Sequence, residues 1–186
     1  MNKVKSTCLA TGFTLASFLA GSIAYGDSLL RPSLSLDAKT VSSQTEETNS
    51  YKTDHGSYDK EYARVRLVEG TLRNMGKEAQ DVTITTYFFG RAVGTNKRVI
   101  LKEEAQICLA MPNITVPIRH NSGIVEGKDL NLAAIGDRYT SGHKIEGWVM
   151  VVTDTQTKQV FCVKGSLPHL EALAKTNGEL EKLPRK

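Results

Sequence analysis

The stretch 62–91 constrains the fold of this chain most, because two β-type runs within it flank a set of turn residues. In the first run, 63–67, apolar residues alternate with arginines, which is the period-two pattern of a strand with one buried face. The sequence Asn-Met-Gly-Lys at 74–77 has the composition of a turn. The second run, 82–89, is β-branched and aromatic almost throughout, as in strands that are covered on both faces. The pattern predicts a hairpin at the centre of a β-sheet.

Shorter runs on both sides of this stretch extend the β pattern. A first strand is expected near 32–42, and apolar alternation marks two strands within 99–109 and another at 114–118. Pro117 has no N–H to donate to a ladder, so this last strand is expected at a sheet edge. A second hairpin is predicted within 145–163. About seven short strands predict an all-β fold, a sandwich of antiparallel sheets.

One short helix is expected near the C-terminus. Ser166 is placed to cap it, and Pro168 falls in the first turn, where its missing N–H costs nothing. Leu170 and Leu173 lie on its apolar face, and two turns are too short to persist alone. We therefore expect the helix to dock on the sandwich, followed by a charged and frayed tail at 177–186.

The first residues have the composition of a signal peptide, assigned to 1–26. Lys3 and Lys5 precede an apolar stretch at 7–20, and Ala-Tyr-Gly at 24–26 has the small residues that a signal peptidase reads. The apolar stretch is short for a membrane span, which disfavours the alternative of an anchor. We expect a periplasmic or extracellular protein with no membrane span after cleavage.

Composition divides the remaining chain into three parts. We expect 27–60 to contain the first strand and a long polar mobile loop at 43–58. The β-sandwich core with its C-terminal helix is assigned to 61–176, and the charged tail to 177–186. Without the two leader lysines, 22 basic residues (24 − 2) face 20 acidic ones, a net charge of +2. That balance does not favour a nucleic-acid partner.

The segment 120–143 has many Gly, Asn and Asp residues and little periodicity. It predicts a long surface loop with one short helix near 130–134. Long loops in compact domains often carry function, so we place the candidate binding site here. The candidate binding residues are His120, Asn121, Arg138, Tyr139 and His143.

Two cysteines, Cys108 and Cys162, remain once Cys8 leaves with the signal peptide. An even number of cysteines in an exported protein favours a disulfide, and both lie in apolar strand sequence. Two separately buried thiols are the alternative, because the sequence does not show whether the two strands are neighbours.

Two segments, 69–74 and 81–89, together resemble bacterial immunoglobulin-like β-sandwich domains of the FxLYD type. In these domains a G-x-(hydrophobic)-x-N strand leads into a D-V-x-(hydrophobic)-x-x-x-(aromatic) strand. Later segments, Glu-Gly-Trp-Val-Met-Val-Val at 146–152 and Ser-Leu-Pro at 166–168, look like exported bacterial proteins with one such domain. The resemblance covers roughly 60–174 and implies an immunoglobulin-like fold. It brings no catalytic residues.

The residues themselves indicate no catalytic site, cofactor or metal. The histidines do not stand at metal-binding spacing, and nucleophile and phosphate-loop motifs are absent from the sequence. A copper site built from His120, His143, Met111 and Met150 is the alternative. We expect no enzyme.

The function favoured by these features is an exported non-catalytic interaction module of the bacterial envelope, whose partner is an envelope protein or a glycan. The alternative is a carbohydrate- or small-ligand-binding sandwich that uses Trp148 and the tyrosines as a stacking surface. Trp148 decides between them, because it lies in apolar strand sequence and is expected to be buried.

Overall fold

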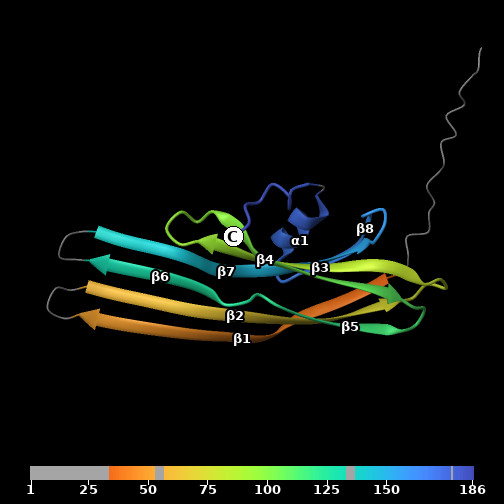
Figure 1. Cartoon of the computed structure of the whole chain (residues 1–186), viewed down its shortest axis with the longest axis horizontal. Coiled ribbons are helices and arrows are strands. Elements are labelled where there is room, and N and C mark those ends of the chain that lie inside the picture. Colours follow the sequence, from red (N-terminus) through yellow and green to blue (C-terminus); the bar gives the residue numbers. More distant parts are fainter. Residues whose placement is uncertain (1–33, 53–56, 133–136, 177) are drawn as a thin grey trace, which may run out of the picture.

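Strands dominate the described part of the chain, which confirms the all-β prediction (Figure 1). The computed structural model describes residues 34–52, 57–132, 137–176 and 178–186. The predicted signal peptide, 1–26, lies outside these residues. The elements are β1 (Leu34–Lys52), β2 (Ser57–Asn74), β3 (Gln80–Ala92), β4 (Arg98–Ala110), β5 (Thr115–Asn121), β6 (Val125–Leu132), β7 (Asp137–Asp154), β8 (Val160–Gly165) and α1 (Pro168–Lys175).

All the strand pairs are antiparallel, in the order β1-β2-β6-β7-β3-β4, with β5 on β2 and β8 on β7. The long strand β7 links two sheets. Its first part pairs with β6 in a first sheet that also contains β1, β2 and β5. Its second part pairs with β3 and β8 in a second sheet that also contains β4.

The two sheets pack face to face around an apolar core, in what we call the sandwich half. Trp148 is only 1 % exposed at its centre, which confirms that it is buried. The indole Nε1–H donates to Thr40 Oγ1 at 2.9 Å, so the buried N–H has a partner. The buried members of this core are Ala38, Val68, Leu72, Val82, Ile84, Phe88, Ala110, Ile118, Trp148, Met150 and Val152.

The helix α1 covers part of the outer face of the second sheet, as predicted. Leu170 is fully buried there, and Leu173 packs against the same cluster with Phe89 and Val149. The predicted cap was wrong, because the N-cap residue is Leu167 and it makes no side-chain cap bond. Ser166 Oγ instead accepts the backbone N–H of Trp148 at 3.0 Å, so this hydroxyl ties the helix start to β7.

The C-terminal residues were expected to fray, and this too was wrong. Leu180 and Leu183 pack against the cluster under α1. The backbone N–H of Ile100 in β4 donates to Pro184 O at 2.8 Å, and Lys186 N–H donates to Ile100 O at 3.0 Å. The tail therefore forms an isolated β-bridge on the edge of β4, between Arg185 and Ile100.

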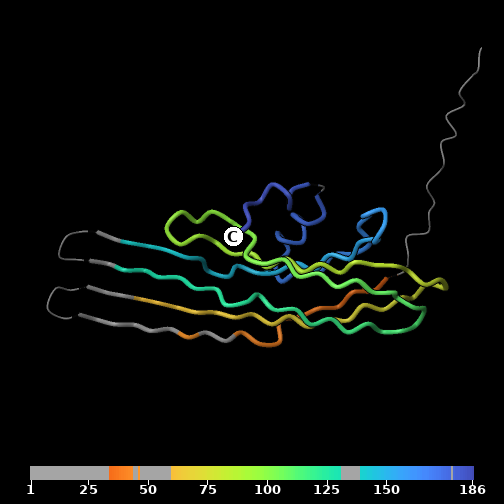
Figure 2. The backbone as a smooth tube through the Cα atoms, viewed as in Figure 1, coloured from red at the N-terminus to blue at the C-terminus, as the bar shows by residue number. Residues whose placement is uncertain are grey.

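The strands β1, β2, β6 and the first part of β7 continue beyond the sandwich as a four-stranded sheet, which we call the extended half (Figure 2). The predicted loop at 43–58 is wrong, since 43–52 and 57–58 are strand. The boundary drawn at 60 therefore falls inside β2. The long loop and the helix predicted within 120–143 are also wrong, because the end of β5, β6 and the start of β7 occupy most of the described part of that segment. Strands with polar faces lack the apolar periodicity on which those predictions relied.

The central hairpin was also predicted wrongly. A turn does follow β2, but β2 pairs with β1, β5 and β6, whereas β3 pairs with β4 and β7. The buried side chain of Asn74 explains the path of the turn. Its Nδ2 donates to Glu78 O at 2.7 Å and to Ala110 O at 2.8 Å, while its Oδ1 accepts Gly76 N–H. These bonds anchor the turn to the end of β4, and the chain crosses from one sheet to the other.

Two of the other strand predictions are confirmed. β7 and β8 form the predicted second hairpin, and β5 pairs with β2 alone, as expected of an edge strand that contains Pro117. The two strands expected within 99–109 are one strand, β4, with a register shift at Leu101. This shift turns Ile100 toward the α1 side, whereas Cys108 and Ala110 face the sandwich core.

Candidate functional site

The five candidate binding residues do not form one site. His120 and Asn121 end β5, whereas Tyr139 and His143 lie on β7, and the backbone of Arg138 pairs with Asn131. His120 lies opposite Val68 of β2, and Tyr139 is connected through Leu130 to Asp59 of the same strand. Nine residues of strand at about 3.4 Å each separate these two positions by about 30 Å. The sequence placed them together only because they share one polar segment.

His120 has a structural role in the sandwich half. It is 4 % exposed, and its Nδ1 lies 2.8 Å from Thr86 Oγ1. Burial lowers the pKa of His120. The charge of Glu104 raises this pKa by a smaller amount, and the charge of Lys102 lowers it. Lys102 Nζ donates to Asn121 O and to Glu104 Oε2, so these residues connect β4 to the end of β5. Within the described residues, no three His, Cys, Asp or Glu side chains are grouped so that they could hold a metal ion.

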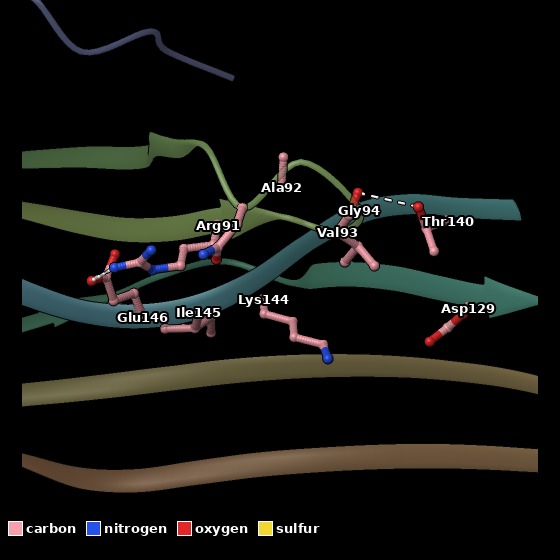
Figure 3. Close-up of a pocket in the computed structure, with 10 residues that line it drawn as sticks. Arg91, Ala92, Val93, Gly94, Asp129, Thr140, Lys144, Ile145 and Glu146 are labelled. Atoms are coloured by element: carbon pink, nitrogen blue, oxygen red, sulfur yellow. Dashed lines mark hydrogen bonds and ion pairs between the residues drawn. The ribbon is translucent and has the colours of Figure 1, made fainter. Parts of the chain in front are cut away.

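A cavity of about 540 Å³ lies beside the turn between β3 and β4 (Figure 3). Two cationic side chains, Arg91 and Lys144, line it together with the carboxylates of Asp129 and Glu146. Aliphatic walls complete a site of the size and mixed polarity that small polar ligands use. The remaining lining residues are Ala92, Val93, Gly94, Asn96, Thr140 and Ile145.

The turn beside the cavity is held in place by the backbone. Val93 N–H donates to Gly142 O at 3.0 Å, and Ala92 N–H donates to Lys97 O at 2.9 Å. Gly94 has a φ of +91°, and a Cβ there would lie 2.2 Å from Thr140 Oγ1, so only glycine fits at this approach. The cavity wall is thus a defined turn packed against β7.

Glu146 lies at the register shift in β7, and its carboxylate contacts three basic side chains. Arg98 Nε and Nη2 donate to its two carboxylate oxygens at 2.7 and 2.6 Å, Arg91 Nη2 donates at 2.9 Å, and His169 Nε2 lies at 3.0 Å. The Glu146 side chain is 8 % exposed. The hydrogen bonds from Arg98, then those from Arg91 and His169, lower the pKa of Glu146 to about 2. The carboxylate is therefore ionised at neutral pH and is not a proton donor.

This cluster was not identified from the sequence. Arg91 and Glu146 are 55 residues apart and meet only because β3 pairs with β7. The sequence signal for this cluster is Glu146 itself, a single carboxylate within the otherwise apolar run 145–152. Two guanidinium groups share that carboxylate, which leaves one positive charge in excess at the cavity wall, even with His169 neutral.

Tyr62 covers Gly127 of β6, which pairs with Gly142 of β7 in the extended half. Its ring lies across Gly127, where an added Cβ would meet the phenol oxygen at 2.2 Å. Arg64 and Lys144 lie 5.5 and 5.6 Å from the ring centroid. Tyr62 is 4 % exposed and Trp148 is buried, so neither is a stacking platform for a glycan. The side chains of Tyr51 and Tyr58 lie outside the described part of the structure.

The predicted disulfide is wrong, because Cys108 and Cys162 are both free thiols. Cys108 lies on β4 and Cys162 on β8, at the two ends of the order β4-β3-β7-β8. Three inter-strand spacings of about 4.8 Å place them about 14 Å apart, far beyond the reach of a disulfide. Burial raises the pKa of Cys162 to about 11 and also raises that of Cys108, so neither is a reactive thiolate.

The edge of β4 is the most apolar exposed strand edge in the described part of the chain. On its outer face Ile107 is 71 % exposed and Leu109 is 51 % exposed. The tail pairs with this edge at Ile100, and Asn121 contacts it at 102–104. Strand β3 pairs with one edge of 105–110, and among the described residues no strand pairs with the opposite edge.

The comparisons with known proteins leave the family open. No family model matches the chain, and no curated protein matches it. A solved structure from Akkermansia muciniphila is 9 % identical, with 83 % of this chain and 82 % of that chain covered and a TM-score of 0.29. A Northeast Structural Genomics Consortium target is 13 % identical, with 69 % and 91 % covered and a TM-score of 0.24. Within the described residues, no helix is long and apolar enough to cross a membrane.

Proposed function

We propose that the chain is an exported, non-catalytic, immunoglobulin-like interaction module of the bacterial envelope, and that it holds its partner at the edge of β4. The observation that carries this proposal is the exposure of Ile107 and Leu109 on a strand edge without a neighbouring strand. The composition of the first 26 residues supports export.

The physical argument concerns unpaired backbone groups. An edge strand presents a row of N–H and C=O groups, and natural proteins usually protect it with charge, proline or a bulge. The stretch 105–110, Ala-Gln-Ile-Cys-Leu-Ala, has none of these. Adding a strand to such an edge gives main-chain hydrogen bonds, and the outward side chains give specificity. Apolar side chains at 107 and 109 suit an extended apolar segment.

Site-specific photocross-linking in cells tests this function. A photoreactive amino acid at Ile107 is expected to cross-link the partner. The same amino acid at Ile124, which is 67 % exposed but lies between β5 and β6, is the matched control and is expected not to. Equal products from both positions, or none from 107, would remove the proposal.

The cavity beside Arg91 favours a second candidate, the binding of a small ligand or a sugar. The surplus positive charge of the Arg91–Arg98–Glu146 cluster suits a carboxylated molecule such as a uronic acid. Calorimetric titration with glucuronate and galacturonate tests it, with Arg91→Leu expected to abolish binding. Uncharged glucose is the control ligand, because it has no carboxylate for Arg91.

A further inference from the structure

We infer that the partner of the β4 edge is a second copy of this chain, paired antiparallel so that Ile107 meets Ile107 of the second copy. This inference rests on the proposed function, since it names the partner of the same edge. It follows from the side-chain pattern of β4, from the charges beside the free stretch, and from the way the tail already uses this edge.

The side-chain pattern of β4 separates two faces. Residues 103, 105, 107 and 109 are exposed on the outer face, whereas 104, 106 and 108 are half-buried and face the sandwich. A two-fold axis perpendicular to the sheet keeps the two outer faces on the same side, so odd residues must lie opposite odd residues. With the axis at Ile107, Ala105 of each copy lies opposite Leu109 of the other. The joint outer row formed by 105, 107 and 109 of the two copies is then wholly apolar.

The charges of β4 exclude axes at Glu103 and Glu104 and are compatible with an axis at Ile107. With the axis at Ile107, Glu103 and Glu104 lie opposite Met111 and Ala110 of the second copy, so no two carboxylates meet. An axis nearer Glu103 or Glu104 would place like charges face to face, which is destabilising. That part of the edge is also occupied, because Asn121 N–H donates to Glu104 Oε2 at 3.1 Å.

The contrast with two neighbouring segments supports pairing at 105–110. The C-terminal tail already adds main-chain hydrogen bonds to β4 at Ile100, so this edge accepts an extended segment. The edge strand β5 contains Pro117 and no outward apolar row of this kind. Pairing through β4 would join the second sheet of one copy to the second sheet of the other. The result is one continuous sheet, in which neither β4 has a free edge.

Mass measurement in solution tests the inference with matched variants. The purified protein is expected to show a concentration-dependent shift from one to two chains by light scattering. Ile107→Lys is expected to weaken this association at least 10-fold, while Ile124→Lys leaves it unchanged. A wild-type protein that stays monomeric at about 200 μM, or an Ile107→Lys protein that still dimerises, would overturn self-pairing.

Cysteine cross-linking tests the register and does not depend on a lysine variant. In a Cys108→Ser, Cys162→Ser background, Ile107→Cys places two thiols opposite each other, with Cβ atoms roughly 4.5–5.5 Å apart. Leu109→Cys in that background faces Ala105 and is the control. Oxidation should link the first variant and not the second, and the reverse result would refute the register. A monomeric protein that still cross-links another envelope protein from 107 would overturn self-pairing and leave the proposed function intact.

Discussion

The sandwich half and the extended half are built from the same strands, yet they are stabilised differently. Along β2, Val68 and Leu72 are fully buried in the sandwich core. The same side of the strand continues into the extended half as Arg66, Arg64 and Tyr62. Backbone pairing continues along the whole strand, but the apolar row stops. The comparison shows that a strand can extend well beyond the core that stabilises it.

This difference predicts unequal mutational effects in the two halves. In the sandwich half, Trp148→Ala removes a fully buried indole and its bond to Thr40, and is expected to lower the free energy of unfolding by about 3–5 kcal/mol. In the extended half, Tyr139→Ala changes an exposed ring and is expected to cost less than about 0.5 kcal/mol. Urea unfolding followed by circular dichroism measures both. Equal losses would mean that the halves share one core.

The sequence predicted the sandwich half where a buried face leaves a periodic pattern. The alternation at 82–89 and the apolar surroundings of Trp148 are direct consequences of burial, so strand β3 and the buried indole were predictable. In the extended half, 43–52 has polar residues on both sides, so nothing in its pattern separates strand from loop. Only pairing with β2 makes it a strand.

The candidate site was less predictable, because it depends on which strands are neighbours. The turn residues at 74–77 suit a hairpin and a crossing between sheets equally well. The bond from Asn74 to Ala110 decides between them, and its partner is 36 residues away. The same reason explains the failed disulfide and the unpredicted Arg91–Glu146 pair. In each case local sequence set the strand, and the order of strands set the contact.

The second prediction concerns helix α1 on the outer face of the second sheet. Leu170 is fully buried between α1 and β7, so Leu170→Ala is expected to cost about 2–4 kcal/mol. Leu173, half-buried in the same cluster, is the internal comparison, and Leu173→Ala is expected to cost less. Urea unfolding ranks the two variants. A loss below about 0.5 kcal/mol for Leu170→Ala would show that the helix adds nothing to the sandwich.

The third prediction concerns the junction of the two halves, where Glu146 binds Arg91 and Arg98. Because the pKa of Glu146 is lowered to about 2, the folded state favours the ionised carboxylate. Its contribution is present above the unfolded pKa of about 4.3 and is lost as the pH falls from there toward 2. Glu146→Gln is expected to cost about 1.5–3 kcal/mol at pH 7. The substitution should also reduce the loss of unfolding free energy that the wild type shows as the pH falls from about 4.3 toward 2. Urea titrations from pH 7 to 2.5 measure both, and an unchanged loss would contradict the assignment.

The fourth prediction has the smallest effect and lies in the extended half. The hydroxyl of Tyr62 is buried and has no hydrogen-bond partner among the described residues, and burial raises its pKa. A buried hydroxyl without a partner costs free energy, so its removal should not destabilise the fold. Tyr62→Phe retains the ring over Gly127 and between Arg64 and Lys144. We expect it to raise the free energy of unfolding by up to about 1 kcal/mol.

The control for Tyr62→Phe is Tyr139→Phe, because Tyr139 is exposed. That substitution is expected to change stability by less than about 0.5 kcal/mol. Thermal unfolding of both variants beside the wild type gives the comparison. A loss above about 1 kcal/mol for Tyr62→Phe would mean that the hydroxyl is satisfied in solution. The extended half would then be held by a buried polar contact, whereas the present geometry assigns that role to ring packing over glycine and two cations.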